Sequence, residues 1–178
     1  MKTYTLKVAG LTRKLPICRT NDKLGFAAFI MFSDVELTVK CTEALLKKCP
    51  PFDVIITAES KGIPIAYEAA RQSGKEYVVA RKSVKLYMTD PISIQVKSIT
   101  TEEVQTLYLS SEDAEKIKGS RVLVLDDVIS TGESLIALNR LIAAAGGEIA
   151  AQAAVLAEGS AADRDDIIFL EKLPLFPL

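Results

Sequence analysis

Two adjacent acids followed by a hydroxyl-rich turn form the clearest chemical motif of the chain. Asp126 and Asp127 end the apolar run RVLVL at 121–125, and the segment STG at 130–132 precedes an apolar helical pattern. Carboxylates accept hydrogen bonds from the vicinal hydroxyls of a sugar. A helix that begins in such a turn offers unpaired N–H groups and a partial positive charge to a phosphate. The segment therefore predicts a site for a phosphorylated sugar.

A simpler interpretation of the same turn is a capping box, in which Ser130 caps the helix and Glu133 returns to the amide of Ser130. This interpretation leaves two adjacent acids after an apolar strand unexplained. Both interpretations can hold together, because Glu133 would repel a bound phosphate unless its carboxylate points outward or back to that amide.

The composition predicts a single folded domain covering residues 1–178, since 49% of the residues are hydrophobic and the net charge is −1. The balanced charge argues against broad binding of nucleic acid. The apolar runs are too short to span a bilayer, and the first residues lack the apolar region of a signal peptide.

Cysteine and histidine usage limits the chemistry further. Cys18, Cys41 and Cys49 show no C-x-x-C spacing, which favours structural thiols in a reducing, cytoplasmic location. Histidine is absent from the sequence, which excludes a Ser–His–Asp triad, a histidine base and the usual zinc sites.

Near-continuous apolar runs alternate with helical patterns along the chain. Strands are expected at 53–58, 77–80, 104–109, 121–127 and 149–157, and helices from Ser33 to the CysProPro stop at 49–51 and at 62–71, 110–119 and 131–145. The stretch 82–103 is polar and irregular. The alternation predicts an α/β fold with a doubly wound, mainly parallel sheet flanked by helices. Because ligands of such sheets bind at the carboxyl ends of the strands, residues 59–62, 81–85 and 126–133 are the candidate site.

The segment RVLVLDDVISTGES resembles the phosphoribosyl-pyrophosphate (PRPP) motif of type I phosphoribosyltransferases. The resemblance implies that Asp126 and Asp127 are catalytic, bind the ribose hydroxyls and engage Mg²⁺ indirectly, while the turn holds the 5′-phosphate. This chain carries Glu133 where the family usually has a small residue. The implied PRPP-binding residues are Asp126, Asp127, Val128, Ile129, Ser130, Thr131, Gly132, Glu133 and Ser134.

Two other strand ends carry the same resemblance. AESKGIP at 58–64 resembles the pyrophosphate loop of the family, in which a non-proline cis peptide is frequent and would here lie near Glu59-Ser60. VVARKSVKLYM at 78–88 resembles a segment of adenine and xanthine phosphoribosyltransferases. An ordinary turn and a solvated basic loop are the simpler interpretations. The implied pyrophosphate-binding residues are Glu59, Ser60, Lys61, Gly62, Arg81, Lys82 and Lys85.

The two ends of the chain resemble the hood that covers the base in this family. FLEKLPLFPL at 169–178 is similar to the ending of adenine phosphoribosyltransferases, and LGFAAFIMFSD at 24–34 supplies the other side, although plain core packing would also explain both. Phe26 and Ile129 are the candidate base-binding residues. The resemblance thus implies a core at about 34–157, a small hood at about 1–33 and 158–178, and a mobile loop at about 86–103 that closes over the site.

The implied function is transfer of the phosphoribosyl group of PRPP to a purine base, giving a nucleoside monophosphate and pyrophosphate in purine salvage, by a cytoplasmic, Mg²⁺-dependent homodimer. Adenine is the favoured base, xanthine, hypoxanthine and guanine stay open, and orotate is disfavoured. The reaction needs no protein nucleophile, which agrees with the missing histidine.

Two other classes compete with the enzyme. A PRPP-binding regulator without catalysis is disfavoured by the short segment before the strand at 53–58 and by the pI of 5.6. A phosphoacceptor receiver domain is disfavoured because its acids follow the first strand, whereas more than a hundred residues precede Asp126.

Overall fold

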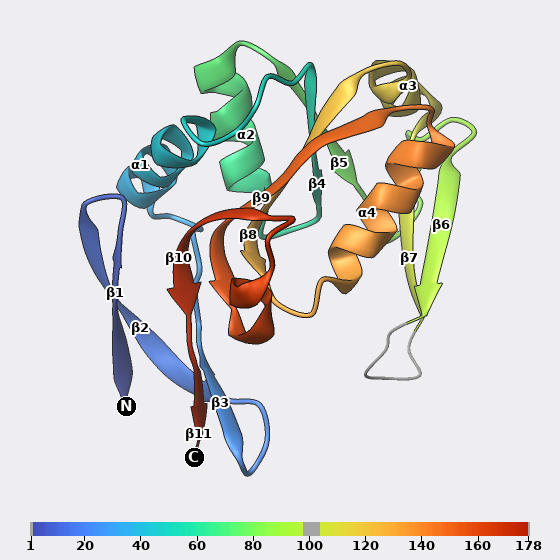
Figure 1. Cartoon of the computed structure of the whole chain (residues 1–178). Coiled ribbons are helices and arrows are strands. Elements are labelled where there is room, and N and C mark those ends of the chain that lie inside the picture. The colour runs from blue at the N-terminus through green and yellow to red at the C-terminus, as the bar shows by residue number, and fades with distance from the viewer. Residues whose placement is uncertain (1, 98–103, 178) are drawn as a thin grey trace.

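The computed structural model describes residues 2–97 and 104–177, and its centre is a parallel sheet (Figure 1). In this part of the chain the sheet has five strands in the order β10-β9-β8-β4-β5, and every neighbouring pair is parallel. The predicted parallel α/β fold is confirmed. The strands are β4 (Val54–Ala58), β5 (Glu76–Ala80), β8 (Arg121–Ile129), β9 (Glu148–Glu158) and β10 (Ile168–Leu173).

Helices cover both faces of this core sheet, which is why its strands are apolar on both sides. Successive residues of β4 pack into different clusters: Ile55 lies with side chains of α1 and α2, and Ile56 lies with side chains of α4. No helix among the described residues is long and apolar enough to cross a membrane. The helices are α1 (Val35–Leu46), α2 (Ile63–Ser73), α3 (Ser111–Ile117), α4 (Glu133–Ala144) and the 3₁₀ helix η1 (Gly159–Asp163).

The N- and C-terminal segments form a second, antiparallel sheet beside the core, which we call the hood (Figure 1). Its strands pair in the order β1-β2-β3-β11, so that the last strand joins the first three. Residues 168–173, assigned to the hood from sequence, instead form β10 at the edge of the core sheet. The hood strands are β1 (Thr3–Val8), β2 (Leu11–Arg19), β3 (Leu24–Ala27) and β11 (Leu175–Pro177).

The stretch 82–103 contains a strand that the sequence analysis took as irregular. β6 (Ile92–Lys97) pairs with β7 (Val104–Leu109) in an antiparallel hairpin that packs on α4. The alternating ISIQV pattern explains the strand, since Val96 is buried in the same cluster as α4. Residues 98–103 of the proposed mobile loop at 86–103 lie outside the described residues.

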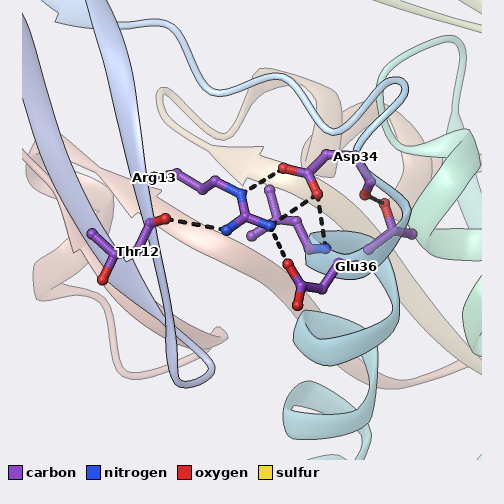
Figure 2. A network of polar contacts seen from close by, with 6 residues as sticks. Thr12, Arg13, Asp34 and Glu36 are labelled. Atoms are coloured by element: carbon purple, nitrogen blue, oxygen red, sulfur yellow. Dashed lines mark hydrogen bonds and ion pairs between the residues drawn. The ribbon is translucent and has the colours of Figure 1, made fainter.

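A charged network ties the hood to the core (Figure 2). Arg13 of β2 donates from Nε to Asp34 Oδ2 over 2.7 Å and from Nη2 to Glu36 Oε2 over 2.8 Å. Asp34 is the N-cap of α1 and accepts from the amide of Leu37 over 3.0 Å. Ser33 and Glu36 have the spacing of a capping box, which predicts a cap at Ser33, but the N-cap is the next residue, Asp34. Hydrogen bonds from Arg13 lower the pKa of Asp34 below its ordinary 3.8.

The three cysteines are free thiols. Burial raises the pKa of Cys41 to about 12 and that of Cys49 to about 11, so both thiols stay protonated at neutral pH. This agrees with the structural role expected for them.

We predict that Arg13→Met lowers the midpoint of thermal unfolding by several degrees at neutral pH, because Asp34 and Glu36 lose their cation. The depressed pKa of Asp34 stabilises the fold above pH 3.8, and this contribution is lost as the pH falls below it. The difference between the two proteins should therefore shrink as the pH is lowered through that range. Lys14→Met, at the exposed next position of β2, is the control, and equal unfolding curves for wild type and Arg13→Met would contradict the prediction.

Candidate active site

The paired acids lie in β8, beyond the point where β4 accompanies it. β4 pairs with β8 only as far as Ile56 and Val124, so Asp126 and Asp127 stand where the sheet opens on that side. β8 itself runs two residues past the acids, to Ile129, along β9. The backbone amide of Asp127 donates to Asp126 Oδ1 over 2.8 Å, which holds the Asp126 carboxylate against the main chain of the strand.

A lysine from the neighbouring turn reaches these acids. Lys61 Nζ lies 3.1 Å from Asp127 Oδ2, and the Asp127 side chain is 2% exposed. A buried carboxylate needs such a partner, because isolated charge is poorly solvated inside a protein. The contact brings the candidate pyrophosphate turn and the PRPP motif together at one point.

Burial raises the pKa of Asp126 well above its ordinary 3.8, and the charge of Asp127 raises it further. The charge of Lys61 opposes this shift. The main physical cause is that a charged carboxylate is poorly solvated at this buried position, and the neighbouring charge of Asp127 adds to the cost.

The segment after β8 forms a small cavity with the start of α4. The cavity has a volume of about 120 Å³. Gly132 is the N-cap of α4 and has a φ of 81°, a left-handed conformation that glycine adopts most readily. Every predicted PRPP-binding residue except Asp127 lines the cavity, together with Leu135: Asp126, Val128, Ile129, Ser130, Thr131, Gly132, Glu133 and Ser134.

The expected capping box at this turn is wrong. The N-cap is Gly132 rather than Ser130, and no side chain caps the helix. Because the chain turns at a glycine with positive φ, Ser130 is displaced from the helix start. Its residue is exposed and lines the cavity instead.

The turn between β4 and α2 contains the cis peptide expected at Glu59-Ser60. Gly62 closes this turn against the core. A Cβ at Gly62 would collide with Thr57 Oγ1 and would lie 3.0 Å from Asp126 Oδ1. Glycine therefore permits the turn to approach β8 closely enough for the Lys61–Asp127 contact.

Glu59 contacts three residues of the basic segment that follows β5. It accepts a hydrogen bond from the amide of Lys82 and lies 3.0 Å from Arg81 Nε and 3.9 Å from Lys85 Nζ. Arg81 Nε is buried and has no hydrogen bond of good geometry among the described residues. Glu59, predicted to bind pyrophosphate, here holds the cations in place, while its own role toward a ligand stays a prediction.

A larger cavity of about 360 Å³ opens between the hood and the carboxyl ends of β8 and β9, which point toward the hood in Figure 1. Phe26 lines it, as expected of a base-binding residue. Ile129 does not; it lines the smaller cavity, and its neighbour Val128 lines both. Alternation along the strand separates these two side chains, and sequence alone gave no reason to prefer one face.

Three further residues at the site were not found from sequence. Thr57 lies under Gly62 with its hydroxyl buried, and Glu158 lines the larger cavity. Arg164 Nη1 would lie 2.7 Å from a Cβ at Gly132, so its guanidinium packs against the turn before α4. Glu158 ends an apolar strand, and the strand-end rule applied to Asp126 would have found it.

The fold and this arrangement define a doubly wound α/β protein whose candidate site lies at the carboxyl ends of its parallel strands. Residues 45–173 match the family model described as phosphoribosyl transferase domain, and the chain belongs to that family. The expected resemblance is thereby confirmed.

Individual relatives agree with this assignment. The chain is 34% identical over 117 residues to a xanthine phosphoribosyltransferase of Exiguobacterium sp., which covers 65% of this chain and 60% of that protein. It is 31% identical over 148 residues to an adenine phosphoribosyltransferase of Rhodococcus jostii, and this match covers 83% of this chain and 78% of that protein. The adenine phosphoribosyltransferase structure from Thermoanaerobacter pseudethanolicus superposes with a TM-score of 0.72 at 22% identity, over 89% of this chain and 95% of that one, which shows the shared fold.

We predict that Gly62→Ala lowers the free energy of unfolding by about 1–3 kcal/mol, because the added methyl group overpacks the turn against Thr57 and Asp126. The lost approach of Lys61 to Asp127 should also weaken ligand binding at this site. Gly10→Ala is the control for backbone strain without a steric clash, because Gly10 has open space around it but a φ of 77°. Denaturant unfolding gives the free energy of unfolding of both variants. A Gly62→Ala protein as stable as wild type would contradict the packing described.

We predict that Asp126→Asn makes the ligand-free protein more stable than wild type at neutral and alkaline pH. A raised folded pKa means that the proton bound to Asp126 stabilises the fold below pH 3.8, and that this contribution is lost as the pH rises through the raised value. Asparagine resembles the protonated acid and removes the dependence. Urea unfolding across this pH range gives the free energy of unfolding of wild type and of Asp126→Asn, and the difference between them should grow as the pH rises. The exposed Asp22→Asn is the control. A difference that is the same at every pH would reject the prediction.

Proposed function

We propose that this protein transfers the phosphoribosyl group of PRPP to a purine base, with adenine as the favoured acceptor, and releases pyrophosphate. The observation that carries the proposal is the 3.1 Å contact between Lys61 Nζ and Asp127 Oδ2. It brings the turn after β4 close to the end of β8 and the turn that follows it. A single ligand with both a 5′-phosphate and a pyrophosphate needs two such turns side by side. Membership of the phosphoribosyl transferase domain family supports it.

Each part of PRPP has a matching group in this proposal. Asp126 and Asp127 accept hydrogen bonds from the ribose hydroxyls. The cavity at residues 130–134 takes the 5′-phosphate at the start of α4. The pyrophosphate binds to the turn Glu59–Gly62 and to four cations, Lys61, Arg81, Lys82 and Lys85. These cations become available when their ion pairs with Asp127 and Glu59 open.

The chemical step is a displacement at the anomeric carbon of PRPP. The bond from this carbon to pyrophosphate breaks, the purine nitrogen bonds to the carbon, and that nitrogen loses its proton. The cations stabilise the charge that develops on the leaving group, so no protein nucleophile is required. Strand β6 lies within the proposed mobile loop at 86–103, and closure of this loop would exclude water.

Magnesium fits the donors of this site as a metal carried in by the substrate. The described residues contain no group of three His, Cys, Asp or Glu side chains that could hold a metal ion. Mg²⁺ commonly uses one or two carboxylates, with phosphate oxygens and waters as the other ligands. Asp126 and Asp127 would engage it through PRPP, and the ion would supply charge neutralisation of the pyrophosphate.

The protein further acts in this proposal as a cytoplasmic homodimer in purine salvage. An apolar patch supports self-association, since Ile30, Phe32, Val35 and Tyr67 are exposed by 53%, 49%, 74% and 56%. The last three line a hollow of about 250 Å³ between α1 and α2. Large exposed apolar patches mark interaction surfaces.

Pyrophosphate release tests the function directly. PRPP and Mg²⁺ are supplied with adenine, hypoxanthine, guanine, xanthine or orotate in parallel, and release with a purine, most rapidly with adenine, is expected. PRPP binding without release by any base would indicate a regulatory PRPP-binding protein instead. Absence of both would reject the proposed ligand.

The variant Asp127→Asn should weaken PRPP binding about tenfold or more and slow pyrophosphate release. A hydrogen bond to a charged group contributes about 1.5–3 kcal/mol, and Asn also loses the pairing with Lys61. Titration calorimetry with PRPP and Mg²⁺ gives the affinity, and Asp22→Asn in the exposed β2–β3 turn is the matched control. Unchanged affinity and turnover in Asp127→Asn would remove Asp127 from the site.

A further inference from the structure

One carboxylate in the larger cavity has no role in the chemistry described above. Glu158 is the last residue of β9 and pairs in register with Leu173 of β10. Both residues line the cavity of about 360 Å³ together with the hood segment 26–30. Glu158 therefore stands where the core sheet, its edge strand and the hood meet.

Glu158 is half-buried, and within residues 2–97 and 104–177 its carboxylate has no ion pair and no side-chain hydrogen bond. The other charged residue lining this cavity is Lys61, whose ammonium group is bound to Asp127 over 3.1 Å. No other described side chain therefore occupies the carboxylate of Glu158, which lines the cavity.

The remaining walls leave few other polar side chains to recognise a base. Ser130 contributes a hydroxyl, which can donate or accept and so discriminates weakly. An ionised carboxylate only accepts hydrogen bonds, and it repels a carbonyl oxygen. The other lining side chains are apolar: Phe26, Ala27, Ala28, Phe29, Ile30, Val128 and Leu173.

We propose that Glu158 determines which purine is accepted, by accepting a hydrogen bond from the 6-amino group and excluding purines with a 6-carbonyl. Adenine carries an amino group and no carbonyl oxygen. Hypoxanthine, guanine and xanthine each carry a 6-carbonyl, whose oxygen would face the carboxylate across an apolar cavity. The inference rests on the proposed function, because it assigns this cavity to the base.

The variant Glu158→Gln tests the inference, since glutamine keeps the shape and adds an amide donor that can bind a carbonyl. We expect the ratio of kcat/KM for adenine over hypoxanthine to fall about tenfold or more, because an acceptor that rejects a carbonyl is replaced by a group that tolerates it. The KM for PRPP should stay unchanged. Glu171→Gln on the exposed side of β10 is the matched control.

Direct binding separates this inference from the proposed catalysis. The affinities of adenine and hypoxanthine are measured by calorimetry on the protein with ribose 5-phosphate and pyrophosphate present. If pyrophosphate release fails but adenine binds with a preference that Glu158→Gln removes, the role of Glu158 stands and the catalytic proposal falls. If release occurs and the preference is the same in both proteins, the role of Glu158 is overturned while the catalytic proposal stands. A protein that binds no purine overturns both.

Discussion

The site is organised around two carboxylates on consecutive residues in a strand that is covered on both sides. Asp126 and Asp127 cannot both be solvated there as anions, so the protein must either supply a cation or hold a proton. It does both: Lys61 contacts Asp127, and the pKa of Asp126 is raised. The contact requires the turn after β4 to approach β8, and that approach requires a residue without a side chain at Gly62. One electrostatic requirement thus sets the shape of the neighbouring turn.

The same logic extends to the basic segment after β5. Arg81 and Lys85 are drawn toward Glu59 of the turn, so the cations are already gathered before any phosphate is present. In the proposed function, a ligand with several negative charges would exchange these internal partners for phosphate oxygens. The free protein then carries electrostatic strain at Asp126, and a ligand that satisfies the acids relieves it. Sites of this kind commonly sacrifice stability in exchange for binding.

The hood contributes the part of the site that the core sheet lacks. Its sheet is built from both ends of the chain, and Arg13 fastens β2 to the first turn of α1 through Asp34 and Glu36 (Figure 2). The cavity between hood and core is largely apolar, so a single carboxylate such as Glu158 has a large influence on what can enter it. The proposed function would therefore separate phosphate binding at the start of α4 from base selection under the hood.

The sequence by itself determined the parallel α/β core through local patterns and the family through a motif, and the resemblance to that family also implied the cis peptide at Glu59-Ser60. It missed β6, placed β10 in the hood, and expected caps at Ser33 and Ser130 that the structure assigns to Asp34 and Gly132. Only the tertiary structure decided which residues meet. Val128, rather than Ile129, lines the cavity beneath the hood together with Glu158 and Phe26, and Arg164 packs against Gly132. These pairs come from strands and loops far apart in sequence, and their meeting depends on packing, for which a single sequence carries no local signal.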